Sequence, residues 1–116
     1  MSYDVCLIDK RPACTCCGRD EEESETDVGN YTDNVAGMWE KALGHRLSDL
    51  DGQTAGNAIS PLEVAVARMT HPPEVAGYRA MNPPNGWGSF EGAVGYLRAI
   101  LAECRRQPNA VIRISH

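Results

Sequence analysis

The feature that most constrains this fold is a long amphipathic segment near the C-terminus, which is entered through an elaborate turn. The turn, residues 82–92, combines a proline pair, an Asn-Gly step and a tryptophan between two glycines. Ser89 stands at a typical N-cap position, and the residues after it carry apolar side chains at helical spacing. These apolar positions are Phe90, Ala93, Val94, Leu97, Ile100, Leu101 and Cys104. A helix with so wide an apolar face must be covered by other elements.

Strand patterns occupy the two ends of the chain. Residues 3–8 alternate apolar and polar side chains, and residues 110–115 are rich in β-branched side chains. Because a lone strand leaves its backbone groups without partners, we expect these two strands to pair. A two-stranded ribbon is marginal by itself and needs helices on one face. The sequence therefore predicts an α+β domain, with about three helices packed on a small sheet formed by the N- and C-terminal strands.

Two further helices are predicted between the terminal strands. The first covers residues 30–44, with polar capping residues at its start and a glycine at its end. The second covers residues 60–71, where a serine cap, a proline and a glutamate form a start signal and a proline pair forms a stop. The links 45–57 and 78–87 are predicted to be irregular.

Length and charge favour one small domain, residues 1–116, with an acidic loop. Residues 10–29 are first cysteine-rich and then acidic, without a hydrophobic period, and are predicted to form a mobile loop. Six of the 16 acidic residues lie between positions 20 and 27, and the remaining ten balance the 11 basic residues. The charge of −5 is therefore local, and no basic stripe predicts nucleic-acid binding.

Hydropathy predicts neither a membrane span nor a secretory signal. No run of 18 apolar residues occurs, and the apolar patch near the N-terminus is too short and too acidic for a signal peptide. The expected location is the cytoplasm.

The cysteine cluster suggests a metal site. Cys14, Cys16 and Cys17 lie in one predicted loop, and thiolates are typical zinc ligands. Cys14 and Cys17 have knuckle spacing, but no second pair follows to complete four ligands. Cys6 and Cys104 fall at strand and helix positions that favour small core residues, although the fourth ligand would have to be one of these two or a histidine. A small zinc-stabilised domain is therefore one hypothesis, and otherwise no cofactor is expected.

Catalytic patterns are weak. A catalytic cysteine needs a base beside it, and the three histidines, His45, His71 and His116, fall in predicted loops or at the terminus. Asp49 and Asp51 lie in a turn, where aspartate is common. A small hydrolase or transferase remains an alternative, which a carboxylate or thiol close to His45 would favour.

Trp87 has two interpretations. It precedes a helix cap, where an apolar residue can pack back onto the first turns as a hydrophobic staple. Alternatively, it forms a recognition site with polar residues from the predicted start of the first helix, since aromatic and amide side chains anchor partners or planar ligands. The residues predicted to bind a ligand or partner are Asn30, Tyr31, Thr32, Asn34, Asn85 and Trp87.

Three segments resemble a set of small proteins encoded by actinobacterial phages, with more distant bacterial relatives. They are Asn30-Tyr31-Thr32-Asp33-Asn34, Gly52-Gln53-Thr54-Ala55-Gly56 and Asn85-Gly86-Trp87-Gly88. The resemblance covers roughly residues 30–115 and implies a phage accessory protein in a host cytoplasm, without an assigned activity. The leading hypothesis is a non-enzymatic binding module that engages a host protein or small ligand through the 30–34 and 82–90 loops.

Overall fold

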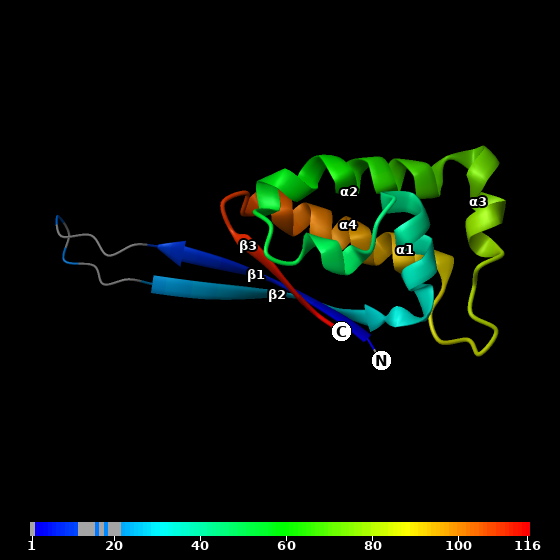
Figure 1. Ribbon diagram of the computed structural model, residues 1–116, viewed down its shortest axis with the longest axis horizontal. Helices are drawn as coiled ribbons and strands as arrows, with labels where there is room; N and C mark the ends of the chain where they lie inside the picture. Colours follow the sequence, from blue (N-terminus) through cyan, green and yellow to red (C-terminus); the bar gives the residue numbers. More distant parts are fainter. Residues whose placement is uncertain (1, 12–15, 17, 19–21) are drawn as a thin grey trace.

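The computed structural model describes residues 2–11, 16, 18 and 22–116 (Figure 1). The helices and strands are β1 (Ser2–Arg11), β2 (Glu22–Thr32), α1 (Ala36–Leu43), α2 (Ala55–Thr70), α3 (Pro72–Arg79), α4 (Phe90–Arg106) and β3 (Val111–Ser115). Two short 3-10 helices, η1 (Asp33–Val35) and η2 (Leu47–Leu50), flank α1. None of these helices is both long and apolar enough to cross a membrane.

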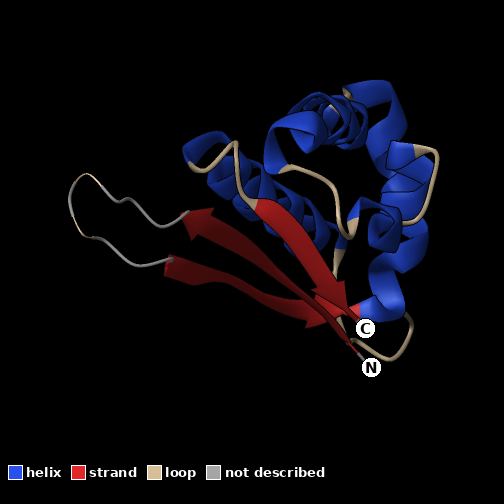
Figure 2. Ribbon diagram, turned by 60° about the vertical axis from the view of Figure 1, so that its left-hand side comes forward, coloured by secondary structure: helices blue, strands red, loops and turns tan. Residues whose placement is uncertain are grey.

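The three strands form an antiparallel sheet in the order β2-β1-β3, and the helices cover one of its faces (Figure 2). Val5 of β1 lies opposite Ile114 of β3, which confirms that the two terminal strands pair. β2 carries a one-residue bulge, because Val5 faces Gly29 whereas Cys6 faces Asp27. The predicted α+β class is confirmed.

The core lies between the sheet and the helix pair α2 and α4. Val5 and Leu7 of β1 are fully buried, as are Trp39 of α1 and Leu97 of α4. The Trp39 indole Nε1 donates a hydrogen bond to the Ala93 carbonyl at 3.1 Å, so this large side chain is buried with its polar atom satisfied. Trp39 is thus a core residue, as its place on the helix face predicts.

The loop predicted over residues 10–29 is wrong for residues 10–11 and 22–29, whereas residues 16 and 18 lie in turns. β1 continues to Arg11, and residues 22–29 belong to β2. Four of the eleven residues of β2 are acidic and exposed, so its sequence has no hydrophobic alternation. Backbone pairing with β1 holds this strand, and Glu23 lies opposite Lys10, an arrangement that favours opposite charges. The rest of the predicted loop falls outside the described residues.

The predicted start of the second helix is also wrong. α2 begins at Ala55, and Pro61 lies inside it. The first free N–H groups of the helix find distant partners: Ala55 N donates to the Ala110 carbonyl at 2.7 Å, and Gly56 N donates to the Pro108 carbonyl at 2.8 Å. Because these partners lie far along the chain, no local capping pattern reveals this start.

α3 was not predicted: it begins at the proline pair that was expected only to end the preceding helix, and its last two residues fall in the link 78–87 that was expected to be irregular. Its two prolines occupy the first positions of the helix, where the missing N–H costs nothing. They end α2 and begin α3 at the same residue, His71. The described chain therefore has four α-helices in place of the three expected, and Tyr78 is the buried residue of α3.

Candidate functional site

All six residues predicted to bind a ligand or partner line one surface hollow of about 710 Å³, which is open to solvent over much of its extent. We call it the Trp87 hollow. Its lining residues are Ser2, Asn30, Tyr31, Thr32, Asn34, Asn85, Trp87 and Gly88. Ser2 was not among the predicted residues, because it joins the group only through the pairing of β1 with β2, and Gly88 was named only as part of the turn.

Two separate segments build the hollow. One is the end of β2 with η1, where the Thr32 hydroxyl caps by accepting from Asn34 N at 3.3 Å. The other is the loop before α4. The side-chain amide of Asn34 joins this loop to η1, because its Nδ2 donates a hydrogen bond to the Trp87 carbonyl at 3.4 Å. Of the polar residues expected to cap the first helix, Asn30 and Thr32, it is Thr32 that acts as a cap, and it caps η1 and not α1 directly.

The turn preceding α4 holds Trp87 outward. Asn85 Oδ1 accepts a hydrogen bond from Trp87 N at 2.9 Å, and the glycines on either side of Trp87 adopt left-handed φ angles of 78° and 99°. A side chain at Gly88 would meet the Thr32 methyl group at 2.5 Å, so the turn packs tightly against η1. The Trp87 side chain itself is 71% exposed. The interpretation of Trp87 as a hydrophobic staple is therefore wrong.

Tyr31 has a structural role at the edge of the hollow. Its hydroxyl accepts a hydrogen bond from Ser89 N at 3.0 Å, and its ring stacks on that of Tyr96 with centroids 6.0 Å apart. Gly92 leaves room for this hydroxyl, since a Cβ at that position would collide with it. Tyr31 thereby joins β2 to the start of α4, where the Ser89 side chain accepts from Gly92 N at 3.1 Å, as predicted for a cap.

The lining of the Trp87 hollow is uncharged. Its side chains offer amides, hydroxyls and two aromatic rings, and none of the described lining residues is acidic, basic or a thiol. The exposed Asn30 amide makes no hydrogen bond within the described part of the chain. This surface can form neutral hydrogen bonds and cover an apolar group, but its own side chains offer no general base at neutral pH.

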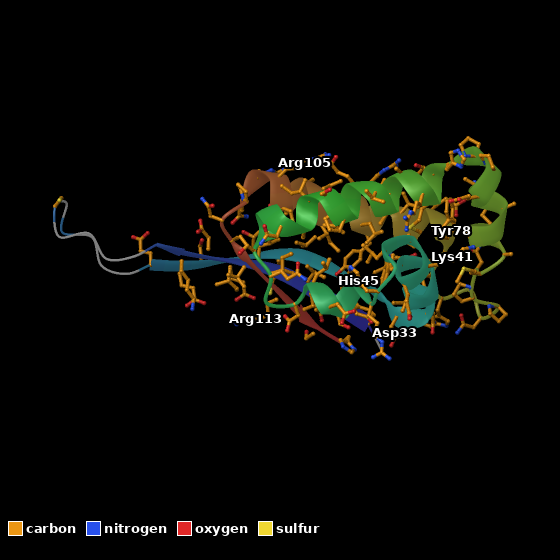
Figure 3. The ribbon with its side chains drawn as sticks, turned by 45° about the horizontal axis from the view of Figure 1, so that its top comes forward. Asp33, Lys41, His45, Tyr78, Arg105 and Arg113 are labelled. Atoms are coloured by element: carbon orange, nitrogen blue, oxygen red, sulfur yellow. The ribbon has the colours of Figure 1, made fainter. Side chains whose placement is uncertain are left out.

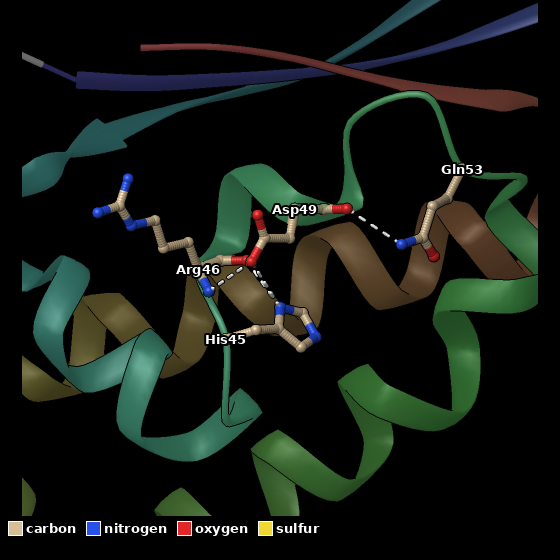
Figure 4. A network of polar contacts seen from close by, with 4 residues as sticks. All are labelled: His45, Arg46, Asp49 and Gln53. Carbon is tan, nitrogen blue, oxygen red and sulfur yellow. Dashed lines mark hydrogen bonds and ion pairs between the residues drawn. The ribbon is translucent and has the colours of Figure 1, made fainter.

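His45 has a carboxylate nearby, but both groups serve the local backbone (Figure 4). Its Nδ1 lies 2.8 Å from the Arg46 carbonyl and 3.8 Å from Asp49 Oδ2. That Asp49 oxygen accepts the Arg46 N–H at 3.1 Å, which caps η2. The 3.8 Å separation exceeds hydrogen-bond length. The geometry is that of a helix cap and gives the hydrolase or transferase alternative no support.

The zinc hypothesis falls mostly outside the described residues, which include Cys16 but neither Cys14 nor Cys17. Cys16 is exposed and forms no disulfide with either of the other described cysteines. Within the described part of the chain, no three histidine, cysteine or acidic side chains are grouped as metal ligands.

The two other cysteines differ from each other. Cys104 is fully buried, as expected, and this burial, followed by the Glu103 carboxylate, raises the pKa of its thiol to about 11. Cys6 is half-buried on the sheet face away from the helices, where its thiol donates to the Arg113 carbonyl at 3.8 Å. The expectation of a core position for Cys6 is wrong, because polar residues of β1 share that face.

Comparison with protein-family models, curated proteins and solved structures gives no match to this chain.

Proposed function

We propose that this protein is a non-enzymatic binding module whose Trp87 hollow receives an uncharged segment of a partner protein. The observation that carries the proposal is the convergence of the six predicted residues around a tryptophan that is 71% exposed. Tryptophan is the side chain most often responsible for a large share of interface energy. The proposal includes the phage accessory role in a host cytoplasm that the sequence resemblance implies.

A protein partner fits the hollow better than a small molecule does. The main aromatic side chain of the Trp87 hollow projects outward, where it can enter the surface of a partner but does not enclose a small ligand. The uncharged lining favours a partner segment without charged side chains at the point of contact. β2 is an edge strand of the described sheet and ends in the hollow, so an extended partner segment has backbone groups to pair with there.

The test begins with capture from host cells and continues with one purified partner. We expect Trp87→Ala to weaken binding of that partner by about 30-fold, the loss typical of an interface anchor. Asn30→Ala should weaken it by a few fold, since this amide makes no bond within the described chain that the substitution would break. Isothermal titration calorimetry measures both constants.

Val64→Ala is the matched control, because Val64 is exposed on α2 and does not line the hollow. It should leave the affinity unchanged. Tyr31→Ala is unsuitable as a test, since Tyr31 supports the fold at Ser89. Trp87→Ala protein that is folded and keeps full affinity for every captured partner would rule the proposal out. A co-purifying small molecule that quenches Trp87 fluorescence would show that the hollow receives a small ligand and not a protein partner.

A further inference from the structure

A second hollow, of about 580 Å³, lies where α1, α2 and α3 meet, and it shares no lining residue with the Trp87 hollow. We call it the Lys41 hollow. Its lining residues are Lys41, Arg68, Pro73, Glu74, Gly77 and Tyr78. Figure 3 shows Lys41 and Tyr78 side by side at the end of the molecule formed by α1 and α3. Its volume is within the range of small-molecule sites.

Two cations line this hollow without a carboxylate partner in the described part of the chain. The Lys41 ammonium lies 4.8 Å from the centre of the Tyr78 ring, over its face. Arg68 donates through one guanidinium nitrogen to the Ala42 carbonyl at 3.1 Å and retains further donors. Glu74 also lines the hollow but forms no ion pair with either cation among the described residues. The net charge of the lining is therefore positive.

The Tyr78 hydroxyl is the observation that indicates a ligand. The Tyr78 side chain is 2% exposed, yet its hydroxyl makes no hydrogen bond within the described residues. A buried polar group is normally hydrogen-bonded, so a ligand or a water molecule in the hollow must supply the partner that the described residues do not. Burial, followed by the Glu74 carboxylate, raises the pKa of Tyr78, so the hydroxyl stays protonated at neutral pH. It is thus a neutral donor beside two cations.

Gly77 lines the hollow beside Lys41. It lies within α3, has no left-handed φ angle, and a methyl group at this position would lie 3.5 Å from Lys41 Nζ. Glycine inside a helix costs about 1 kcal/mol relative to alanine. Neither the backbone conformation nor the space at this position requires glycine, since 3.5 Å is an ordinary van der Waals distance.

We propose that the Lys41 hollow binds a small phosphomonoester, with its phosphate on Lys41, Arg68 and the Tyr78 hydroxyl. Phosphate offers several acceptor oxygens, which match an ammonium, a guanidinium and a neutral hydroxyl donor. The hollow is larger than a phosphate group, and Glu74 at its side can accept a hydrogen bond from a hydroxyl on the rest of the ligand.

The experiment is a titration of the full-length protein with inorganic phosphate and with glycerol 3-phosphate at pH 8, at constant ionic strength, followed by amide NMR. Both should give saturable shifts at Gly77. Tighter binding of glycerol 3-phosphate identifies the ligand as a phosphomonoester, and equal binding identifies it as the free ion. Absence of a saturable shift at Gly77 with either compound overturns the proposal.

Substitutions assign the donors. Lys41→Met should weaken binding at least about tenfold, the usual effect of losing a charge-assisted hydrogen bond. Lys10→Met is the matched control, because Lys10 is exposed on β1 and does not line the hollow. If both variants weaken ligand binding equally, the phosphate is attracted nonspecifically by the charge of the protein, and the proposed site is wrong.

Tyr78→Phe separates a binding role from a structural one. Phenylalanine keeps the ring that packs on Phe90 and beneath Lys41. Because the hydroxyl is unpartnered within the described residues, its removal should leave the ligand-free protein as stable as before, or more so, while binding falls several fold. Lower stability with unchanged binding contradicts the assignment of the hydroxyl to the ligand.

Discussion

At the scale of single residues, the aromatic side chains of this protein take two opposite roles. Trp39, inside α1, is fully buried, whereas Trp87, just before α4, is mostly exposed. The difference arises from the glycines beside Trp87, whose left-handed φ angles turn it away from α4. Local sequence could predict the Ser89 cap and the Gly44 helix end, because both depend on neighbouring backbone groups.

Gly92 should be essential for the contact between Tyr31 and α4. Gly92→Ala places a methyl group against the Tyr31 hydroxyl, and we expect the free energy of unfolding to fall by about 1–3 kcal/mol. Gly95 is the matched control, because it lies in the same helix, is exposed and has open space around it. Gly95→Ala should stabilise by up to about 1 kcal/mol. Urea unfolding measures the unfolding free energy of both variants. An equal increase in the two would mean that the Tyr31 side chain moves aside freely.

Cys104 should make stability fall with pH in the alkaline range. Because its folded pKa is raised from 9.0 to about 11, its contribution is fully present below pH 9 and is lost as pH rises toward 11. Between pH 8 and 10 the unfolding free energy should drop by roughly 1 kcal/mol more in the natural protein than in Cys104→Ala. Urea unfolding at both pH values tests this. An equal drop in unfolding free energy in the natural protein and in Cys104→Ala would contradict this role of Cys104.

At the scale of elements, the sequence predicted those whose signals are local and missed those whose partners are distant. α4 and the paired terminal strands carry a clear hydrophobic period, and both were predictable. β2 has no such period, and it forms because its backbone pairs with that of β1. The start of α2 depends on carbonyls of residues 108 and 110, which no local pattern contains. The Trp87 hollow was largely predictable, because both segments that form it have turn residues recognisable in the sequence. The Lys41 hollow was not, because its donors come from three helices that only the fold brings together.

Pro61 should be a weak point of α2. It lies inside the helix, where proline supplies no N–H to the carbonyl of Asn57 and strains the preceding turn. We expect Pro61→Ala to raise the unfolding free energy by about 1 kcal/mol or more. Pro72→Ala is the control, since Pro72 occupies the first position of α3, where proline is well tolerated. Thermal unfolding compares the two; a loss of stability in Pro61→Ala would show that the proline ring packs usefully.

At the scale of the whole molecule, the core and the far part of the β1–β2 hairpin are physically distinct. β3 pairs with β1 from Asp4 to Ile8, and the paired residues of β1 and β2 beyond Ile8 extend past the helices (Figure 1). The buried core cluster takes side chains from β1 no further than Leu7. The hairpin beyond Ile8 therefore adds backbone pairing and charge to the molecule, but few of the apolar contacts that stabilise it.

A shortened hairpin tests this separation and the zinc hypothesis together. Lys10 and Glu23 face each other across β1 and β2, so residues 11–22 can be replaced by Asn-Gly, a dipeptide that favours two-residue hairpin turns. The replacement removes Cys14, Cys16 and Cys17 and leaves both hollows intact. Since the core is unchanged, we expect the unfolding free energy to stay within about 1 kcal/mol of the natural value. Urea unfolding of both proteins, with and without a chelator, is the measurement. If zinc held by these cysteines supports the fold, the chelator would destabilise the natural protein to the level of the shortened one, because a structural zinc site contributes its binding energy to folding.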